Sequence, residues 1–221
     1  MAKQNDVQNR PDALIVAVTG GIGCGQSTVA KFLEKQGAKI IDADAIGHAV
    51  VNSDESVRRE IRRQLGNQYF FQNGRLNRRL LGQAVFEDER KLYKLNQIVH
   101  PRMVSRIIEK IETAKNGGRH PVIVIDAALV YEINIENIFD AVIVVSSRMR
   151  ERIARVKKRD RLTEKEIRDR ISKQIPVQEK ARWADYVIYN NSTLERLEER
   201  SKQIYRELLR KTKKMKINAK V

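Results

Sequence analysis

The residues best suited to chemistry form a glycine-rich segment, residues 20–27, which reads GGIGCGQS. It follows an apolar run over Leu14–Thr19 and precedes a helical pattern in which Val29 and Leu33 share a face. Glycines let a backbone wrap closely around phosphate oxygens, and the N–H groups of the turn and of the helix N-terminus then face the anion. The segment predicts a phosphate-binding loop, although a glycine-rich turn can also be only a tight connection.

Two side chains of this loop bear on the chemistry in opposite ways. Ser27 offers a hydroxyl to Mg²⁺, as the serine or threonine of such loops does. Gln26 stands where the pattern G-x-x-x-x-G-K-[ST] has lysine, and a neutral amide cannot neutralise the β- and γ-phosphates. We therefore expect nucleotide binding to persist, phosphoryl transfer to be slow or absent, and replacement of Gln26 by lysine to give a substantial gain.

Aspartates follow two further apolar runs. Asp42 and Asp44 come at the end of the second run, and Asp126 ends the third. Ligands of open parallel sheets bind beyond the carboxyl ends of the strands. A phosphotransferase needs one carboxylate to orient or deprotonate the attacking hydroxyl and another to hold Mg²⁺. These aspartates are candidates for both roles, although either end could instead provide a helix cap or a solvent-facing charge.

The elements that must position these residues are short runs rich in β-branched residues, separated by helical patterns. Their apolar character is typical of strands that are buried on both faces of a parallel sheet. Pairs typical of capping boxes, Thr163 with Glu166 and Ser192 with Glu195, indicate helix starts. The order predicts an α/β, three-layer P-loop kinase fold with a five-stranded parallel sheet, a helical substrate-binding insert and a lid. The expected strands are Leu14–Thr19, Lys39–Asp42, Pro121–Asp126, Ala141–Val145 and Tyr186–Tyr189.

Composition narrows the class of protein. The 221 residues suffice for one α/β core, and the single cysteine, Cys24, excludes an intrachain disulfide, so we expect a reducing, cytoplasmic compartment. No apolar run is long enough to span a membrane. The net charge is +16, of which residues 148–170 and 206–221 each contribute +6. Aromatic residues do not alternate with the basic runs, which argues against a nucleic-acid stacking surface.

Several further segments together resemble dephospho-CoA kinases over roughly positions 14–200. After the loop come the segments IDAD at 41–44, NGRLNR at 73–78, HP at 100–101 and ADYVI at 184–188, the last followed by Asn190. The stretch DAALVYE at 126–132 is similar to that family's D-x-P-L-L-F-E, with Ala128 in place of proline. Residues of a lid and of the helix after it also match, namely Arg155, Arg159, Thr163, Arg170, Gln174 and Lys180.

The resemblance implies transfer of the γ-phosphoryl group of ATP to the 3′-hydroxyl of dephospho-CoA, the last step of coenzyme A biosynthesis, with ATP and Mg²⁺ as cofactors. It implies Asp44 as the general base and Arg159 as a lid arginine over the transferring group, and it implies Ser27 and Asp126 at the metal. On the acceptor side it implies Asp42, Arg78, His100 and Leu129. Implied nucleotide contacts are Gly21, Ile22, Gly23, Cys24, Gly25, Gln26, Ser27, Thr28, Arg155 and Asn190.

These expectations divide the chain into parts. A nucleotide-binding core comprises 14–52, 119–147 and 184–205, and 53–118 forms a helical CoA-side domain with a break at His100–Pro101. Residues 148–183 form the lid and the following helix, 1–13 a flexible extension and 206–221 a basic tail. The expected partners are ATP and dephospho-CoA, without membrane or nucleic acid, and a monomer is favoured.

For several of these residues the sequence is also compatible with a purely structural role. His100 can be a packed loop residue, Arg78 a solvated helix charge, and Arg155 and Arg159 solvent-facing charges of a surface helix. Two other functions also remain. The chain can be a different P-loop kinase acting on a nucleoside monophosphate or another hydroxyl, or a nucleotide-binding regulatory protein, for which Gln26 is the main support.

Overall fold

The computed structural model describes residues 13–218, except for the side chains of 214–218. The chain divides into two compact units. The sheet unit comprises the residues up to Ile41 and those from Ile111 onward, and the helical unit comprises Asp42–Lys110. None of the described helices has both the length and the apolar composition that crossing a membrane requires.

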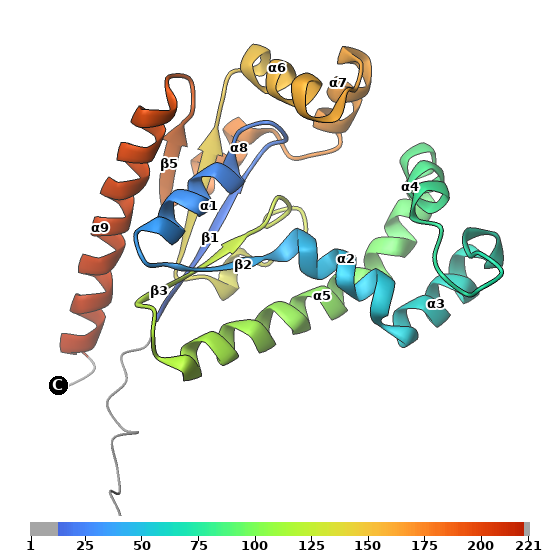
Figure 1. Cartoon of the computed structure of the whole chain (residues 1–221), viewed down its shortest axis with the longest axis horizontal. Coiled ribbons are helices and arrows are strands. Elements are labelled where there is room, and N and C mark those ends of the chain that lie inside the picture. Colours follow the sequence, from blue (N-terminus) through green and yellow to red (C-terminus); the bar gives the residue numbers. More distant parts are fainter. Residues whose placement is uncertain (1–12, 219–221) are drawn as a thin grey trace, which may run out of the picture. The chain divides into compact units, whose positions relative to one another are not determined.

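A five-stranded sheet forms the centre of the sheet unit, in the order β2-β3-β1-β4-β5 (Figure 1). The strand β1 pairs in parallel with β3 and with β4, and β4 pairs in parallel with β5. The strands are β1 Leu14–Gly20, β2 Lys39–Asp42, β3 Val122–Asp126, β4 Ala141–Ser146 and β5 Tyr186–Tyr189. Every residue of β1, β3 and β4 is buried, which is why these strands are apolar except near their carboxyl ends. The predicted parallel α/β fold is confirmed.

Helices cover both faces of this sheet. The connection from β1 to β2 and the connection from β4 to β5 run in opposite directions across the sheet, so right-handed crossovers place their helices on opposite faces. Helix α1 packs against α9 and the sheet, while α8 packs against β4. The helices of this unit are α1 Gln26–Lys35, α6 Met149–Asp160, α7 Glu164–Ser172, α8 Val177–Trp183 and α9 Leu194–Asn218, with the 3₁₀ turn η2 at Glu136–Ile138.

The helix starts agree with the sequence at one position and differ at another. Thr163 and Glu166 form the predicted capping box at the start of α7. At α9 the box predicted at Ser192 is wrong by one residue, because the hydroxyl of Thr193 accepts the bond from the backbone N–H of Arg196. Both residue types cap helices, and only the backbone conformation selects between neighbours. Residues 206–213 of the expected tail belong to α9, in which Leu208 and Thr212 are buried.

The helical unit contains no strand among its residues. Its elements are α2 Ala43–Ser53, α3 Glu55–Leu65, the 3₁₀ turn η1 Asn67–Tyr69, α4 Arg78–Glu87 and the first part of α5 Glu89–Gly117. The break predicted at His100–Pro101 is wrong, because Pro101 lies inside α5. A proline removes one backbone donor, and the burial of Ile98, Val99 and Ile107 along the same helix favours its continuation.

Candidate active site

The glycine-rich loop connects β1 to α1, and its backbone conformation requires glycine at two positions. Gly23 and Gly25 have φ angles of 77° and 95°, in the left-handed region that other residues avoid. A methyl group at Gly23 would also lie 2.6 Å from the carbonyl oxygen of Arg152. Gly25 is the N-cap of α1, so Gln26 begins the helix. The loop therefore ends at a helix N-terminus, where backbone N–H groups favour an anion.

Gln26 reaches the carboxyl end of the neighbouring strand β3. Its side-chain Nε2 donates to Oδ1 of Asp126 at 3.1 Å. Asp126 is 8% exposed, and its carboxylate is the last group of β3. A neutral amide thus occupies the position from which a loop lysine would face this buried acid. Two residues that the sequence placed at the same site, 100 positions apart, are in direct contact.

Arg155 and Asn190, both implied nucleotide contacts, hold the loop from α6 and from the end of β5. Arg155 donates through Nη1 to the carbonyl of Gly23 at 3.3 Å and through Nη2 to the carbonyl of Asn190 at 2.9 Å. The side-chain amide of Asn190 donates to the carbonyl of Cys24 at 2.9 Å. The structure therefore brings both residues to the loop, where they contact its backbone.

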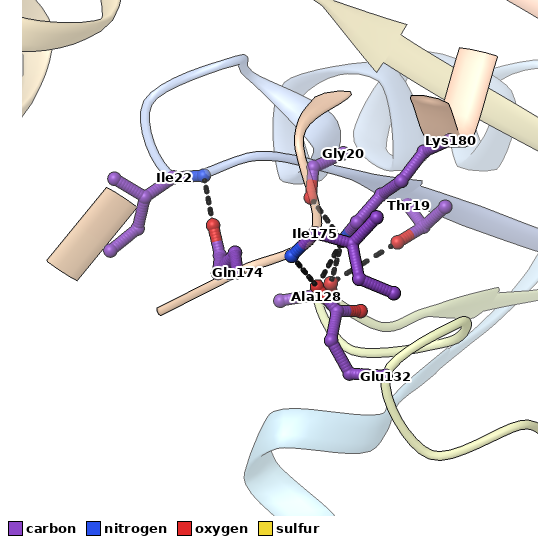
Figure 2. A network of polar contacts seen from close by, with 8 residues as sticks. All are labelled: Thr19, Gly20, Ile22, Ala128, Glu132, Gln174, Ile175 and Lys180. Carbon is purple, nitrogen blue, oxygen red and sulfur yellow. Dashed lines mark hydrogen bonds and ion pairs between the residues drawn. The ribbon is translucent and has the colours of Figure 1, made fainter. Parts of the chain in front are cut away.

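A buried lysine lies behind the loop. Lys180, on α8, is fully buried, and its Nζ donates to the carbonyl of Gly20 at 3.3 Å and to the carbonyl of Ala128 at 3.1 Å (Figure 2). The same nitrogen is 2.6 Å from Oε1 of Glu132. Because buried charges are tolerated when they are paired and hydrogen-bonded, this ion pair fixes the start of the loop to the turn after β3.

The segment between α7 and α8 adds two bonds to this network, which Figure 2 shows. Oε1 of Gln174 accepts from the backbone N–H of Ile22 at 2.9 Å, and Oε1 of Glu132 accepts from the backbone N–H of Ile175 at 3.2 Å. The hydroxyl of Thr19 donates to the Ala128 carbonyl at 3.3 Å. Together with Lys180, these contacts determine the position of the loop backbone.

The expected lid arginine Arg159 lies near the end of α6 and pairs with its neighbour Asp160. Its Nε and Nη2 donate to the two carboxylate oxygens at 2.7 and 2.8 Å. The hydrogen bond from Arg159 lowers the pKa of Asp160, and the same pair raises the pKa of Arg159. The Arg159 side chain is 66% exposed, so this bidentate pair is open to solvent.

The acceptor-side candidates other than Leu129 lie in the helical unit. Asp42 is the N-cap of α2, and its Oδ1 accepts from the backbone N–H of Ala45 at 2.8 Å, which is the capping role left open above. Asp44 is exposed in the first turn of α2, and Arg78 is exposed at the first position of α4. His100 is half-buried within α5, and burial lowers its pKa.

The metal candidates and Leu129 lie in the sheet unit. Ser27 is exposed on the first turn of α1, and Asp126 is buried at the end of β3. A hydroxyl and a carboxylate are the oxygen donors that Mg²⁺ prefers, so their chemistry fits this ion. Among the described side chains, residues 13–213, no three His, Cys, Asp or Glu side chains are grouped so that they could hold a metal ion. Leu129 is half-buried in the turn after β3.

The sequence missed one residue at the loop. Arg152 counted only as one of the eleven basic residues in 148–170. In the structure it is 4% exposed, and its Nε donates to the carbonyl of Ile22 at 2.9 Å. A helical repeat could have indicated that it lies one turn before Val156 on a partly buried face, but not which loop this face contacts.

Comparisons with known proteins agree with this geometry. Residues 14–196 match the family model described as dephospho-CoA kinase. A dephospho-CoA kinase of Thermobifida fusca is 39% identical over 90% of this chain and 98% of its own, and one of Lactobacillus acidophilus is 33% identical over 86% and 94%. The crystal structure of TT1252 from Thermus thermophilus superposes with a TM-score of 0.73 at 31% identity, over 89% of this chain and 98% of that one. A dephospho-CoA kinase from Campylobacter jejuni, at 24% identity and a TM-score of 0.66, shares the fold over 89% and 97%. The chain therefore belongs to the dephospho-CoA kinase family.

Proposed function

We propose that this chain performs its family's reaction at the loop of residues 20–27, transferring the γ-phosphoryl group of ATP to the 3′-hydroxyl of dephospho-CoA. The observation that carries the proposal is the contact between Gln26 and Asp126. It places the start of α1, a phosphate-binding element, beside the buried carboxylate that ends β3. Mg²⁺ bound through Ser27 and Asp126 would neutralise charge on the β- and γ-phosphates.

The residues of the chain have separable roles in this reaction. The loop N–H groups bind the phosphates, and Arg155 and Asn190 keep the loop in position through its carbonyls. The carboxylate of Asp44 accepts the proton of the acceptor hydroxyl as the new O–P bond forms. The bond between the γ-phosphorus and the β–γ bridging oxygen breaks, and ADP leaves with that oxygen. Arg159 stabilises the transferring group when it exchanges Asp160 for phosphate.

The test is ADP formation by the purified full chain with Mg-ATP, measured with and without dephospho-CoA. We expect ADP to form in proportion to the added dephospho-CoA, and the product to carry the new phosphate on the 3′-hydroxyl of the ribose. A panel of nucleoside monophosphates serves as the control. Phosphorylation of a nucleoside monophosphate with none of dephospho-CoA would reject this acceptor.

A second candidate is favoured by Gln26 alone. A chain without a loop cation can bind ATP and still transfer its phosphate too slowly for metabolism, which is the behaviour of a nucleotide-binding regulatory protein. Calorimetry separates the two. Tight ATP binding with no turnover on dephospho-CoA supports the regulatory protein, and turnover on dephospho-CoA rejects it.

A further inference from the structure

Among the described side chains, Arg152 is a buried cation without a carboxylate partner. It lies on α6, is 4% exposed, and donates through Nε to the carbonyl of Ile22. Across the described side chains, residues 13–213, Arg152 takes part in no ion pair, so no Asp or Glu oxygen lies within 4.0 Å of its guanidinium. Its two terminal nitrogens, Nη1 and Nη2, make no hydrogen bond within that part of the chain and keep contact with solvent.

Burying the Arg152 guanidinium without an opposite charge is unfavourable in free energy unless an anionic ligand binds to it. Arginine does not lose its proton in proteins, so the buried guanidinium stays charged. Removing a charge from water is unfavourable when no opposite charge compensates it. A single carbonyl dipole offsets part of this cost. Lys180, the other buried cation beside the loop, is by contrast paired with Glu132 at 2.6 Å.

The free end of Arg152 lies against the backbone of the phosphate loop. A methyl group added to Gly21 would lie 2.5 Å from Nη2 and 2.9 Å from Cζ of Arg152. Because Gly21 has no side chain, the guanidinium lies directly against the loop backbone. The approach depends on the glycine, because any larger residue at position 21 would displace the arginine.

Packing holds Arg152 in this position before any ligand binds. The next residue, Ile153, and Val156 one turn later form a buried cluster with Ile167, against which Ile22 of the loop also packs. The α6 face that carries Arg152 is thus fixed to the loop by apolar contacts. A cation that is held in place needs no reorganisation during the reaction, unlike the 66% exposed Arg159.

We propose that Arg152 supplies to the phosphates of the bound nucleotide the positive charge that Gln26 does not supply. The four N–H groups on its terminal nitrogens suit phosphate oxygens, and such charge-assisted bonds are roughly twice as strong as neutral ones. This inference rests on the proposed nucleotide site at residues 20–27. It also changes the expectation for Gln26→Lys, because a lysine would then repeat a charge that is already present.

A double-mutant cycle tests the exchange of roles, using the full chain, Mg-ATP and dephospho-CoA. The four proteins are the natural chain, Arg152→Gln, Gln26→Lys and the double variant. Glutamine at position 152 keeps a donor for the Ile22 carbonyl and removes the charge. Arg150→Gln, on the same helix but exposed, is the matched control. Each protein is measured for kcat, for KM of ATP, for ATP affinity by calorimetry without acceptor, and for thermal unfolding.

We expect Arg152→Gln to lower kcat/KM for ATP by about tenfold or more, which corresponds to about 1.4 kcal/mol. Gln26→Lys should change kcat/KM for ATP by less than about threefold in the natural chain but raise it by about tenfold in the Arg152→Gln chain. Arg150→Gln should have the same kcat/KM as the natural chain. The thermal unfolding temperature of Arg152→Gln should not be lower than that of the natural chain, because the change removes a buried charge that has no carboxylate partner among the described side chains.

Two results would overturn the inference. One is a kcat/KM of Arg152→Gln within twofold of the natural chain, and the other is the same fold gain from Gln26→Lys in both backgrounds. If Arg152→Gln does not fold, Arg152→Lys, which keeps the positive charge, is measured in its place. The kcat/KM of this variant for ATP should lie near the natural value, and a tenfold loss would reject the role of the charge. Failure of the natural chain to bind ATP would instead reject the nucleotide site itself.

Discussion

The side-chain amide of Gln26 donates to the carboxylate of Asp126 over 3.1 Å, joining the first turn of α1 to the end of β3. This contact sets the electrostatics of the proposed metal site. The amide is neutral and only donates a hydrogen bond, so it does not compensate the charge of an ionised carboxylate. A lysine in place of Gln26 would compete with a divalent cation for the same carboxylate.

Asp126→Asn tests that arrangement. The asparagine oxygen can still accept from Gln26, so the change removes charge and keeps the hydrogen bond. We expect the Mg²⁺ concentration for half-maximal rate to rise by about tenfold or more, with kcat reduced, because a carboxylate ligand is lost. Thermal unfolding in the absence of nucleotide is the control for folding. An unchanged Mg²⁺ dependence would show that Asp126 does not hold the metal.

Asp44→Asn tests the proposed base. We expect kcat to fall by about 10²-fold or more, with little change in the affinity for either substrate, because a positioned base acts in the transition state. Thermal unfolding of the variant is the control for the start of α2, whose cap at Asp42 this change leaves in place. Full turnover of the Asp44 variant would leave that residue a surface charge.

Arg159→Ala tests the lid arginine. Turnover should fall and ATP binding should weaken by about 1–3 kcal/mol, the range for hydrogen bonds to charged groups. Asp160→Asn is a sharper companion, because it removes the carboxylate that holds Arg159 in this structure. We expect turnover of that variant to equal or exceed the natural value. If neither variant changes turnover or ATP binding, Arg159 is only a solvent-exposed charge.

Lys180→Met should destabilise the fold. It leaves the carboxylate of Glu132 buried without its cation, and breaking a buried pair from one side costs about 3–5 kcal/mol. Glu132→Gln in the same chain removes the remaining charge and keeps an acceptor for the Ile175 N–H. Denaturant unfolding should therefore show a smaller loss for the double variant than for Lys180→Met. Equal losses would mean that the packing of the lysine stem, and not its charge, matters.

His100 should contribute to acid sensitivity. Burial lowers its pKa below 6.5 in the folded chain, so on acidification the unfolded chain binds the proton first. The free energy of unfolding should therefore decrease as the pH falls through 6.5 towards the folded-state pKa. His100→Gln should remove that part of the decrease, measured as the difference between the two proteins at pH 7.5 and 5.5. Parallel curves would show that the imidazole titrates equally in both states.

Local patterns in the sequence were enough to find the strands and the loop. Leu14–Gly20 and the other buried strands are mostly apolar because both of their faces are covered, and that signal needs no knowledge of their neighbours. The glycines of the loop and the Thr163 cap were equally local. Where local signals conflicted, the sequence misled. Pro101 indicated a break, but the buried residues on either side of it lie on one continuous helix.

The charges around the loop were decided by tertiary structure alone. Arg152 lies 130 positions from Ile22, and Lys180 lies 160 positions from Gly20. No periodicity within α6 or α8 distinguishes a basic residue that turns towards the loop from one that faces solvent. The sheet order brings these distant segments together. Burial then strengthens the electrostatic interactions of each charge, because the dielectric constant of the protein interior is low. The sequence thus determined that a phosphate loop without its lysine is present, and the packing of α6 decided that a buried arginine lies beside it.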